Sequence, residues 1–155
     1  ISFSADHYLS VYSIETGELK KPYAGSSEIK GIRSFPYPKE PEKSESIMWE
    51  WFICNDFYKS VFYDKYKNVY YRMAQLPVDE YVQGYNGNEK PTIIVVLDSD
   101  MNYLGEALLP KAKFEYEMHS CFVSPDGFNI QVNTDNDDML TFYTYTFLPD
   151  EKDEK

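Results

Sequence analysis

The sequence predicts an all-β fold built from antiparallel meanders. Three observations support this fold class. Apolar and polar residues alternate with a period of two in segments that are bounded by turn residues. Aromatic residues make up 17% of the chain, with fifteen Tyr and ten Phe, and such residues favour strands. Helix signals are weak, since residues 76–85 include Pro77 and Gly84 and leave room for a turn or two.

The first three strand predictions come from the N-terminal half. Residues 8–14 alternate in character and are followed by a turn at residues 15–18, where Gly17 can adopt a positive φ. Residues 60–64 and 69–74 form a second hairpin around a turn at residues 65–68.

The remaining strands follow the same pattern. Residues 92–97 and 103–109 flank an Asp- and Asn-rich turn at residues 98–102. Residues 120–123 and 128–132 flank the Ser-Pro-Asp-Gly turn of residues 124–127, and residues 139–147 form the last strand. We therefore expect a succession of hairpins from one end of the chain to the other.

Residues 47–53 are apolar on both sides of a two-residue period, which predicts a strand buried on both faces with Trp49 and Trp51 on the same side. Residues 34–46 include three prolines and several charges, which predicts a solvated extended loop. At 155 residues the chain predicts one domain, residues 1–148, followed by a disordered charged tail at residues 149–155.

A Leu-Pro dipeptide closes three of these segments, at Leu76-Pro77, Leu109-Pro110 and Leu148-Pro149. Proline cannot donate to a β-ladder, so it suits the place where an outer strand ends and the chain crosses to the next unit. A period of about 40 residues made of strands alone is typical of four-stranded propeller blades. The fold class is then a partial or fragmentary β-propeller, with an ordinary sandwich as the alternative.

The segment Phe122-Val123-Ser124-Pro125-Asp126-Gly127-Phe128-Asn129-Ile130 resembles the F-x-S-P-D-G-x-x-I hairpin of TolB-like β-propellers. Residues 60–147 as a whole are similar to uncharacterised propeller lipoproteins, domains of unknown function, from Bacteroides-type bacteria. The resemblance implies about six blades and a location in the cell envelope. It supplies no catalytic residue.

At about 40 residues a blade, this chain supplies three or four blades, whereas propellers close with four to eight. We therefore expect it to be the C-terminal part of a longer chain. With the resemblance, this implies a protein of the periplasm or cell surface, lipid-anchored through a signal upstream of Ile1.

The formal net charge of −11 argues against nucleic-acid binding, because the chain repels phosphate backbones. No apolar run reaches the roughly 18 residues of a transmembrane segment. Cys54 and Cys121 are expected to be buried thiols in strands, with a long-range disulfide as the alternative.

The sequence predicts neither a catalytic site, nor a metal site, nor a cofactor. Asp98, Asp100 and Asn102 match only the first half of a calcium loop, so a hairpin turn is the preferred interpretation. The acidic loop at residues 135–138 is likewise expected to be an ordinary turn.

Aromatic residues beside amides suit recognition of a sugar or peptide by stacking and hydrogen bonding. The predicted ligand-binding residues are Tyr81, Tyr85, Asn86, Asn88, Trp49 and Trp51. The predicted function is a non-catalytic binding or scaffold module that contacts a protein or a glycan through a face of loops. The alternative is a carbohydrate-active hydrolase or lyase that uses paired carboxylates.

Overall fold

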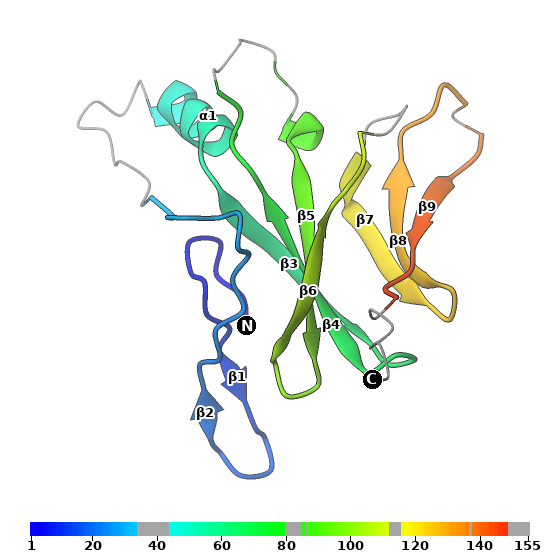
Figure 1. Cartoon of the computed structure of the whole chain (residues 1–155). Helices are drawn as coiled ribbons and strands as arrows, with labels where there is room; N and C mark the ends of the chain where they lie inside the picture. The colour runs from blue at the N-terminus through cyan, green and yellow to red at the C-terminus, as the bar shows by residue number, and fades with distance from the viewer. Residues whose placement is uncertain (34–43, 80–84, 86, 112–115, 137, 149–155) are drawn as a thin grey trace, which may run out of the picture.

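A computed structural model describes residues 1–33, 44–79, 85, 87–111, 116–136 and 138–148. It confirms a mostly-β fold with antiparallel meander sheets (Figure 1). In chain order the elements are β1 (Val11–Tyr12), β2 (Leu19–Lys20), α1 (Ser44–Cys54), β3 (Phe57–Asp64), β4 (Val69–Gln75), η2 (Gly87–Glu89, a 3₁₀ helix), β5 (Thr92–Asp98), β6 (Tyr103–Leu108), β7 (Tyr116–Ser124), β8 (Gly127–Val132) and β9 (Thr141–Tyr145).

The strands form three sheets in which neighbours in sequence are neighbours in space. The first sheet is β1-β2, the second is β3-β4-β5-β6, and the third is β7-β8-β9. All pairs are antiparallel, as in a meander. The predicted hairpins are therefore present, with strand ends displaced by a few residues.

The turn between β5 and β6 shows how a short polar sequence directs a hairpin. One carboxylate oxygen of Asp98 accepts hydrogen bonds from the backbone N–H groups of Asp100 and Asn102, each at 2.8 Å. Together with a bond from the Asn102 side chain, these interactions lower the pKa of Asp98. The Asp98–Asn102 segment is thus the hairpin turn predicted from the sequence.

Gly127 begins β8 directly after the turn residues Pro125 and Asp126. Its φ of +146° lies in a region that side chains disfavour. A Cβ placed on it would collide with the backbone oxygen of Tyr145 on β9. The position therefore requires glycine both for its conformation and for the close approach of two strands.

Replacing Gly127 with alanine is expected to lower the free energy of unfolding by about 2–4 kcal/mol, because backbone strain and a steric clash add. The measurement is urea denaturation. Gly31→Ala is the matched control, since a Cβ there would meet no atom within 4 Å. Equal stability of the two variants would contradict this account of Gly127.

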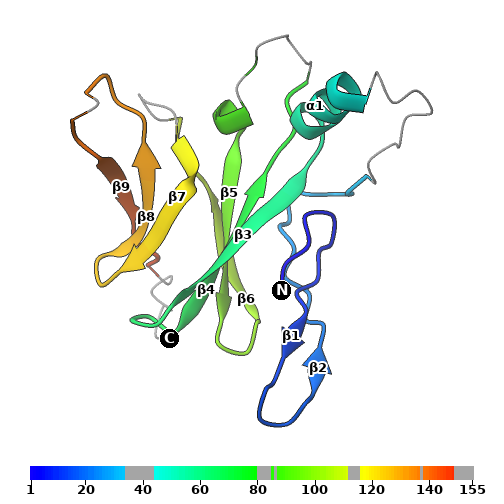
Figure 2. The same ribbon diagram turned by 180° about the vertical axis from the view of Figure 1, so that it is seen from behind.

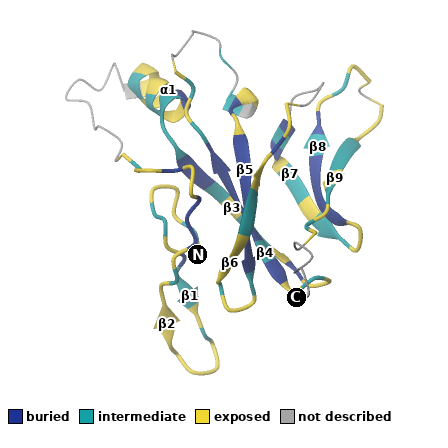
Figure 3. Cartoon of the chain, in the orientation of Figure 1, coloured by how far each residue is buried: buried dark blue, intermediate teal, exposed yellow. Residues whose placement is uncertain are grey.

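The four-stranded sheet is the middle layer of the molecule (Figures 1 and 2). Its strand β5 is buried on both faces, which explains its nearly continuous apolar sequence. Ile94 and Val96 face the β7-β8-β9 sheet, while Ile93, Val95 and Leu97 face the N-terminal segment. The buried residues are accordingly concentrated in the central strands of the molecule (Figure 3).

The larger core lies between the two larger sheets. Tyr71 and Met73 of β4 belong to the same buried cluster as Phe128 and Ile130 of β8. The ring of Phe128 lies 5.3 Å from that of Tyr71 and 5.0 Å from that of Phe62, measured between centroids. Aromatic packing thus holds the three-stranded sheet against the four-stranded one.

On the opposite face, Arg72 of β4 binds the N-terminal segment, residues 1–33. Its side chain is fully buried, and its guanidinium lies 3.6 Å from the centroid of the Tyr58 ring. The guanidinium donates hydrogen bonds to oxygen atoms of five residues of this segment. These acceptors are Ser2 Oγ and the backbone oxygens of Phe3, Asp6, His7 and Ala24. Burial lowers the pKa of Arg72 to about 10, so the group still carries its charge at neutral pH.

The prediction for residues 47–53 was wrong, because they belong to helix α1 and not to a buried strand. Met48, Trp49, Phe52 and Ile53 have the spacing of one helix face. Trp49 and Trp51 therefore point in different directions. The helix begins at Ser44, so the predicted loop was also too long at its C-terminal end; residues 34–43 lie outside the described part of the chain.

Two smaller expectations also need correction. Leu76-Pro77 lies between β4 and β5 of one sheet, so it does not end a unit; Leu109-Pro110 does follow the last strand of that sheet. Cys54 ends a helix, Cys121 lies in β7, and both are free thiols that are only partly buried. The predicted tail at residues 149–155 lies outside the described residues.

Candidate functional site

The helix cavity is a pocket of about 360 Å³ where α1 meets β3, β4, β7 and η2. Its walls combine apolar and basic side chains. The lining residues are Met48, Trp49, Phe52, Ile53, Phe57, Lys59, Gln75, Gly87, Lys90 and His119. Trp49 is 49% exposed and Phe52 is 37% exposed, so two aromatic rings are accessible from solvent here.

The C-terminal end of α1 is held in place by groups from outside the helix. The Lys90 ammonium donates to the backbone oxygens of Phe52 and Asn55, at 2.6 and 2.7 Å. The backbone N–H of Val78 donates to Ile53 O at 3.1 Å. A cation at this end also complements the helix dipole, which matters because the last turn contains no basic residue. These bonds fix the aromatic face of α1 over the sheet.

The two lysines of the helix cavity differ in their surroundings. Lys90 is 3% exposed and lies over the Phe57 ring, 4.5 Å from its centroid, and burial lowers its pKa to about 8. Lys59 is half-buried, and burial lowers its pKa as well. The ion pairs found within the described residues do not include Lys59 or Lys90. Neither ammonium group therefore has a contacting carboxylate among the residues that the structure describes.

The structure places the predicted ligand-binding residues in different locations. Trp49 lines the helix cavity, whereas Trp51 does not. The Trp51 ring instead packs edge-on against the Phe52 ring, with 5.6 Å between the ring centroids. Tyr85 is half-buried and does not line the helix cavity. Asn88 lies in η2, but its side chain, like Tyr81 and Asn86, lies outside the described part of the chain.

Sequence reasoning missed Phe52, Lys59, Gln75, Lys90 and His119 as members of one site. A helical reading of residues 44–54 would have placed Phe52 beside Met48 and Trp49. Lys59, Gln75 and His119 come from three different strands and Lys90 from the connection between η2 and β5, and no spacing along the chain brings them together.

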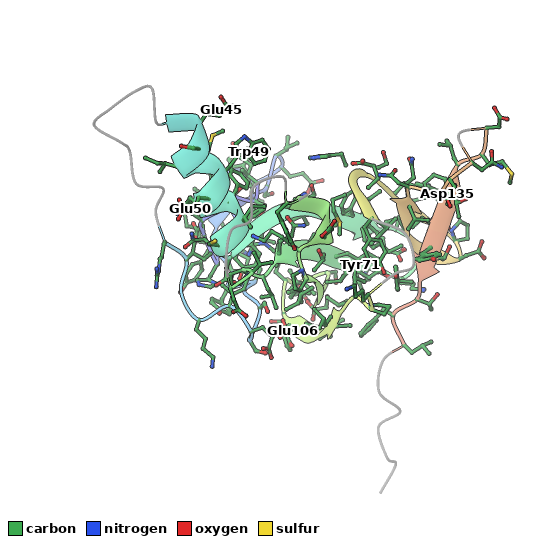
Figure 4. The ribbon with its side chains drawn as sticks, turned by 90° about the horizontal axis from the view of Figure 1, so that it is seen from above. Glu45, Trp49, Glu50, Tyr71, Glu106 and Asp135 are labelled. Carbon is green, nitrogen blue, oxygen red and sulfur yellow. The ribbon has the colours of Figure 1, made fainter. Side chains whose placement is uncertain are left out.

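A second pocket, the intersheet cavity, has a volume of about 400 Å³ and is mainly apolar. It is lined by Tyr71, Ile94, Val96, Leu104, Gly105, Glu106, Ala107, Leu109, Phe128, Tyr145, Thr146, Phe147 and Leu148. Seen from above, Trp49 of the helix cavity and Tyr71 of the intersheet cavity lie well apart (Figure 4).

The described lining residues of the two cavities do not include the pair of carboxylates that a glycoside hydrolase mechanism needs. Glu106 is the single acidic residue among the described lining residues of either cavity. Its carboxylate accepts hydrogen bonds from the backbone N–H of Ser27, at 3.1 and 3.2 Å, and from the Ser27 hydroxyl. Glu106 thus joins β6 to the N-terminal segment.

Other reactive groups have structural surroundings. Burial raises the pKa of the Cys121 thiol to about 11, which makes it a poor nucleophile at neutral pH. No group of three or more His, Cys, Asp or Glu side chains suited to a metal ion occurs in the part of the chain that the structure describes. In the acidic loop, the Asn136 side chain accepts a hydrogen bond from the backbone N–H of Asp138, while Asp137 is not described.

One protein-family model matches most of the chain. The model of the domain of unknown function DUF4221 matches residues 1–108, which is most of the chain. The chain belongs to the DUF4221 family. Among curated proteins, no significant match is found.

A crystal structure of a DUF4221 family member from Bacteroides vulgatus has a similar fold. The TM-score is 0.71 at 22% sequence identity, and the match covers 93% of this chain and 42% of that one. At this identity the match establishes a shared fold. The present DUF4221 chain spans less than half the length of that relative.

Within the described residues, no helix is both long and apolar enough to cross a bilayer.

Proposed function

We propose that this chain is part of a non-catalytic binding module of the bacterial cell envelope, with a TolB-like propeller as its complete architecture. Its ligand is a glycan that enters the helix cavity. The envelope location is supported by the resemblance of residues 60–147 to propeller lipoproteins. The propeller is supported by the meander order and by the four-stranded sheet, which has the size of a blade.

One observation carries the binding role, namely two exposed aromatic rings beside polar side chains in one pocket. The C–H face of a sugar ring packs on aromatic side chains, and its hydroxyl groups take the hydrogen bonds. Trp49 and Phe52 supply such rings, while Lys59, Gln75 and His119 supply polar groups. A volume of about 360 Å³ falls within the usual range for small-ligand sites, and so favours a sugar residue over a flat protein surface.

Tryptophan fluorescence provides a direct test, since both tryptophans of the chain lie in α1. Titration with neutral and acidic trisaccharides is expected to change the emission of the wild-type protein in a saturable way. Phe52→Ala is expected to weaken binding about tenfold or more, because removal of a stacking ring costs on the order of 1.5 kcal/mol.

The matched control is Tyr66→Ala, which removes an exposed ring from the turn between β3 and β4, outside the helix cavity. It is expected to bind as the wild type does. Equal binding by the Phe52 variant, or no response to any of the sugars, would overturn the proposal of a glycan in this cavity.

A further inference from the structure

The polar side chains that line the helix cavity are mostly basic, although the chain as a whole is acidic. Lys59, Lys90 and His119 line it together with Gln75, and its described lining includes no carboxylate. Elsewhere in the chain acids prevail, since 26 Asp and Glu stand against 15 Lys and Arg. The cavity is therefore a local departure from the composition of the chain.

Lys90 contributes a positive charge to the site, but its ammonium group already donates hydrogen bonds to the protein backbone. Two of its three donors serve the carbonyl groups of Phe52 and Asn55, and its ammonium lies over the Phe57 ring. Asp56, Cys54 and Lys59 act on it electrostatically. We assign Lys90 a positioning role, because it holds the end of α1 that carries Phe52.

Lys59 is the basic group available to a ligand. It lies on β3, half-buried at the cavity, and it is absent from the hydrogen bonds and ion pairs shown by the described residues. Glu117 and Cys121 act on it electrostatically, but neither lines the cavity. Glu117 also accepts a hydrogen bond from the backbone N–H of His119 at 3.3 Å. An ammonium group that is partly desolvated and lacks a contacting anion favours an anionic ligand.

The accessible aromatic face and the available cation belong to the same pocket. We propose that the helix cavity binds a carboxylate carried on a six-membered ring, with Trp49 and Phe52 taking the ring and Lys59 taking the carboxylate. An acidic sugar residue and an aromatic acid share this chemistry. The inference rests on the proposed binding function and names the class of its ligand.

The test compares each acid with its own methyl ester, which keeps the ring and removes the charge. Trigalacturonate and its methyl ester represent the sugar, and benzoate and methyl benzoate represent the aromatic acid. Binding is measured by tryptophan fluorescence at low salt. The wild type is expected to bind at least one of the acids about tenfold more tightly than its ester, and added salt is expected to reduce this preference.

Substitutions at Lys59 separate charge recognition from a general effect on the fold. Lys59→Gln is expected to reduce the acid-to-ester preference to less than threefold, while Lys59→Arg is expected to retain it. Lys65→Gln, which removes an exposed lysine from the β3–β4 turn, is the matched control and is expected to leave the preference unchanged. Circular dichroism verifies that each variant is folded.

The outcomes distinguish the two proposals. If an ester binds as tightly as its acid, the carboxylate inference is overturned while the binding function stands. If the preference survives in Lys59→Gln, the assignment of Lys59 is overturned. If no acid or ester binds to the wild type but a neutral trisaccharide does, the carboxylate inference is overturned and the glycan site stands. A response to the benzoate pair alone identifies an aromatic acid and overturns the glycan.

Discussion

Replacing Arg72 with methionine is expected to lower the free energy of unfolding by about 3–5 kcal/mol and to release the N-terminal segment. The guanidinium is fully buried and donates to oxygen atoms of five residues between Ser2 and Ala24. Methionine fills part of the volume but donates no hydrogen bond. The Ala24 contact is buried and the other four are partly buried, so a net cost of about 1 kcal/mol for each lost bond gives an effect of this size.

Urea denaturation measures the loss of stability, and limited trypsin digestion locates it. Lys20 and Lys30 are exposed in the N-terminal segment and become cleavable once that segment detaches. The control is Arg33→Met, an exposed arginine whose replacement is expected to change stability by less than about 0.5 kcal/mol. If trypsin cleaves the Arg72 variant no faster than this control, Arg72 does not anchor the segment.

Phe128→Ala is the second substitution with a large expected effect, again about 3–5 kcal/mol, the usual range for a buried phenylalanine. Phe128 is 1% exposed and its ring packs between Tyr71 and Phe62. It also lines the intersheet cavity, so truncation would enlarge an existing space between the two sheets. The loss of stability therefore combines lost burial with a larger void.

The measurement is again urea denaturation, with hydrogen exchange of β4 and β8 to show where the structure loosens. Phe122→Ala is the matched control, because Phe122 lies in the partner strand β7 and is 45% exposed. Its replacement is expected to cost less than about 1 kcal/mol. Similar losses for the two variants would mean that Phe128 does not hold the sheets together.

The hairpins could be predicted because their information is local. The turn at Asp98–Asn102 satisfies its own backbone N–H groups through the Asp98 side chain, and the alternation on either side needs no distant residue. The same holds for Gly127, whose conformation only glycine adopts without strain.

Helix α1 shows where local reasoning failed. Its aromatic residues favour a strand by propensity, and a two-residue period fits Trp49 and Trp51 as well as a helical period fits Met48, Trp49, Phe52 and Ile53. The carbonyl groups at the end of the helix find their donors in Lys90 and Val78, which lie far along the chain. Tertiary contacts of this kind override propensity.

The candidate site was predictable only in part. The aromatic character of the segment suggested Trp49, and the structure places Trp49 at the helix cavity. The basic residues Lys59 and His119 reach that cavity from β3 and β7, which belong to different sheets. Their proximity follows from how the sheets pack, and no sequence motif predicts it.

By itself the sequence determined the hairpins from β3 onward, their order and their turns, because alternation and turn chemistry act over a few neighbouring residues. The tertiary structure decided which elements share a face, why an arginine lies buried in a central strand, and where a basic pocket forms in an acidic chain. Those outcomes depend on contacts between residues such as Arg72 and Asp6, 66 positions apart. Long-range contacts of this kind have no counterpart in the local pattern.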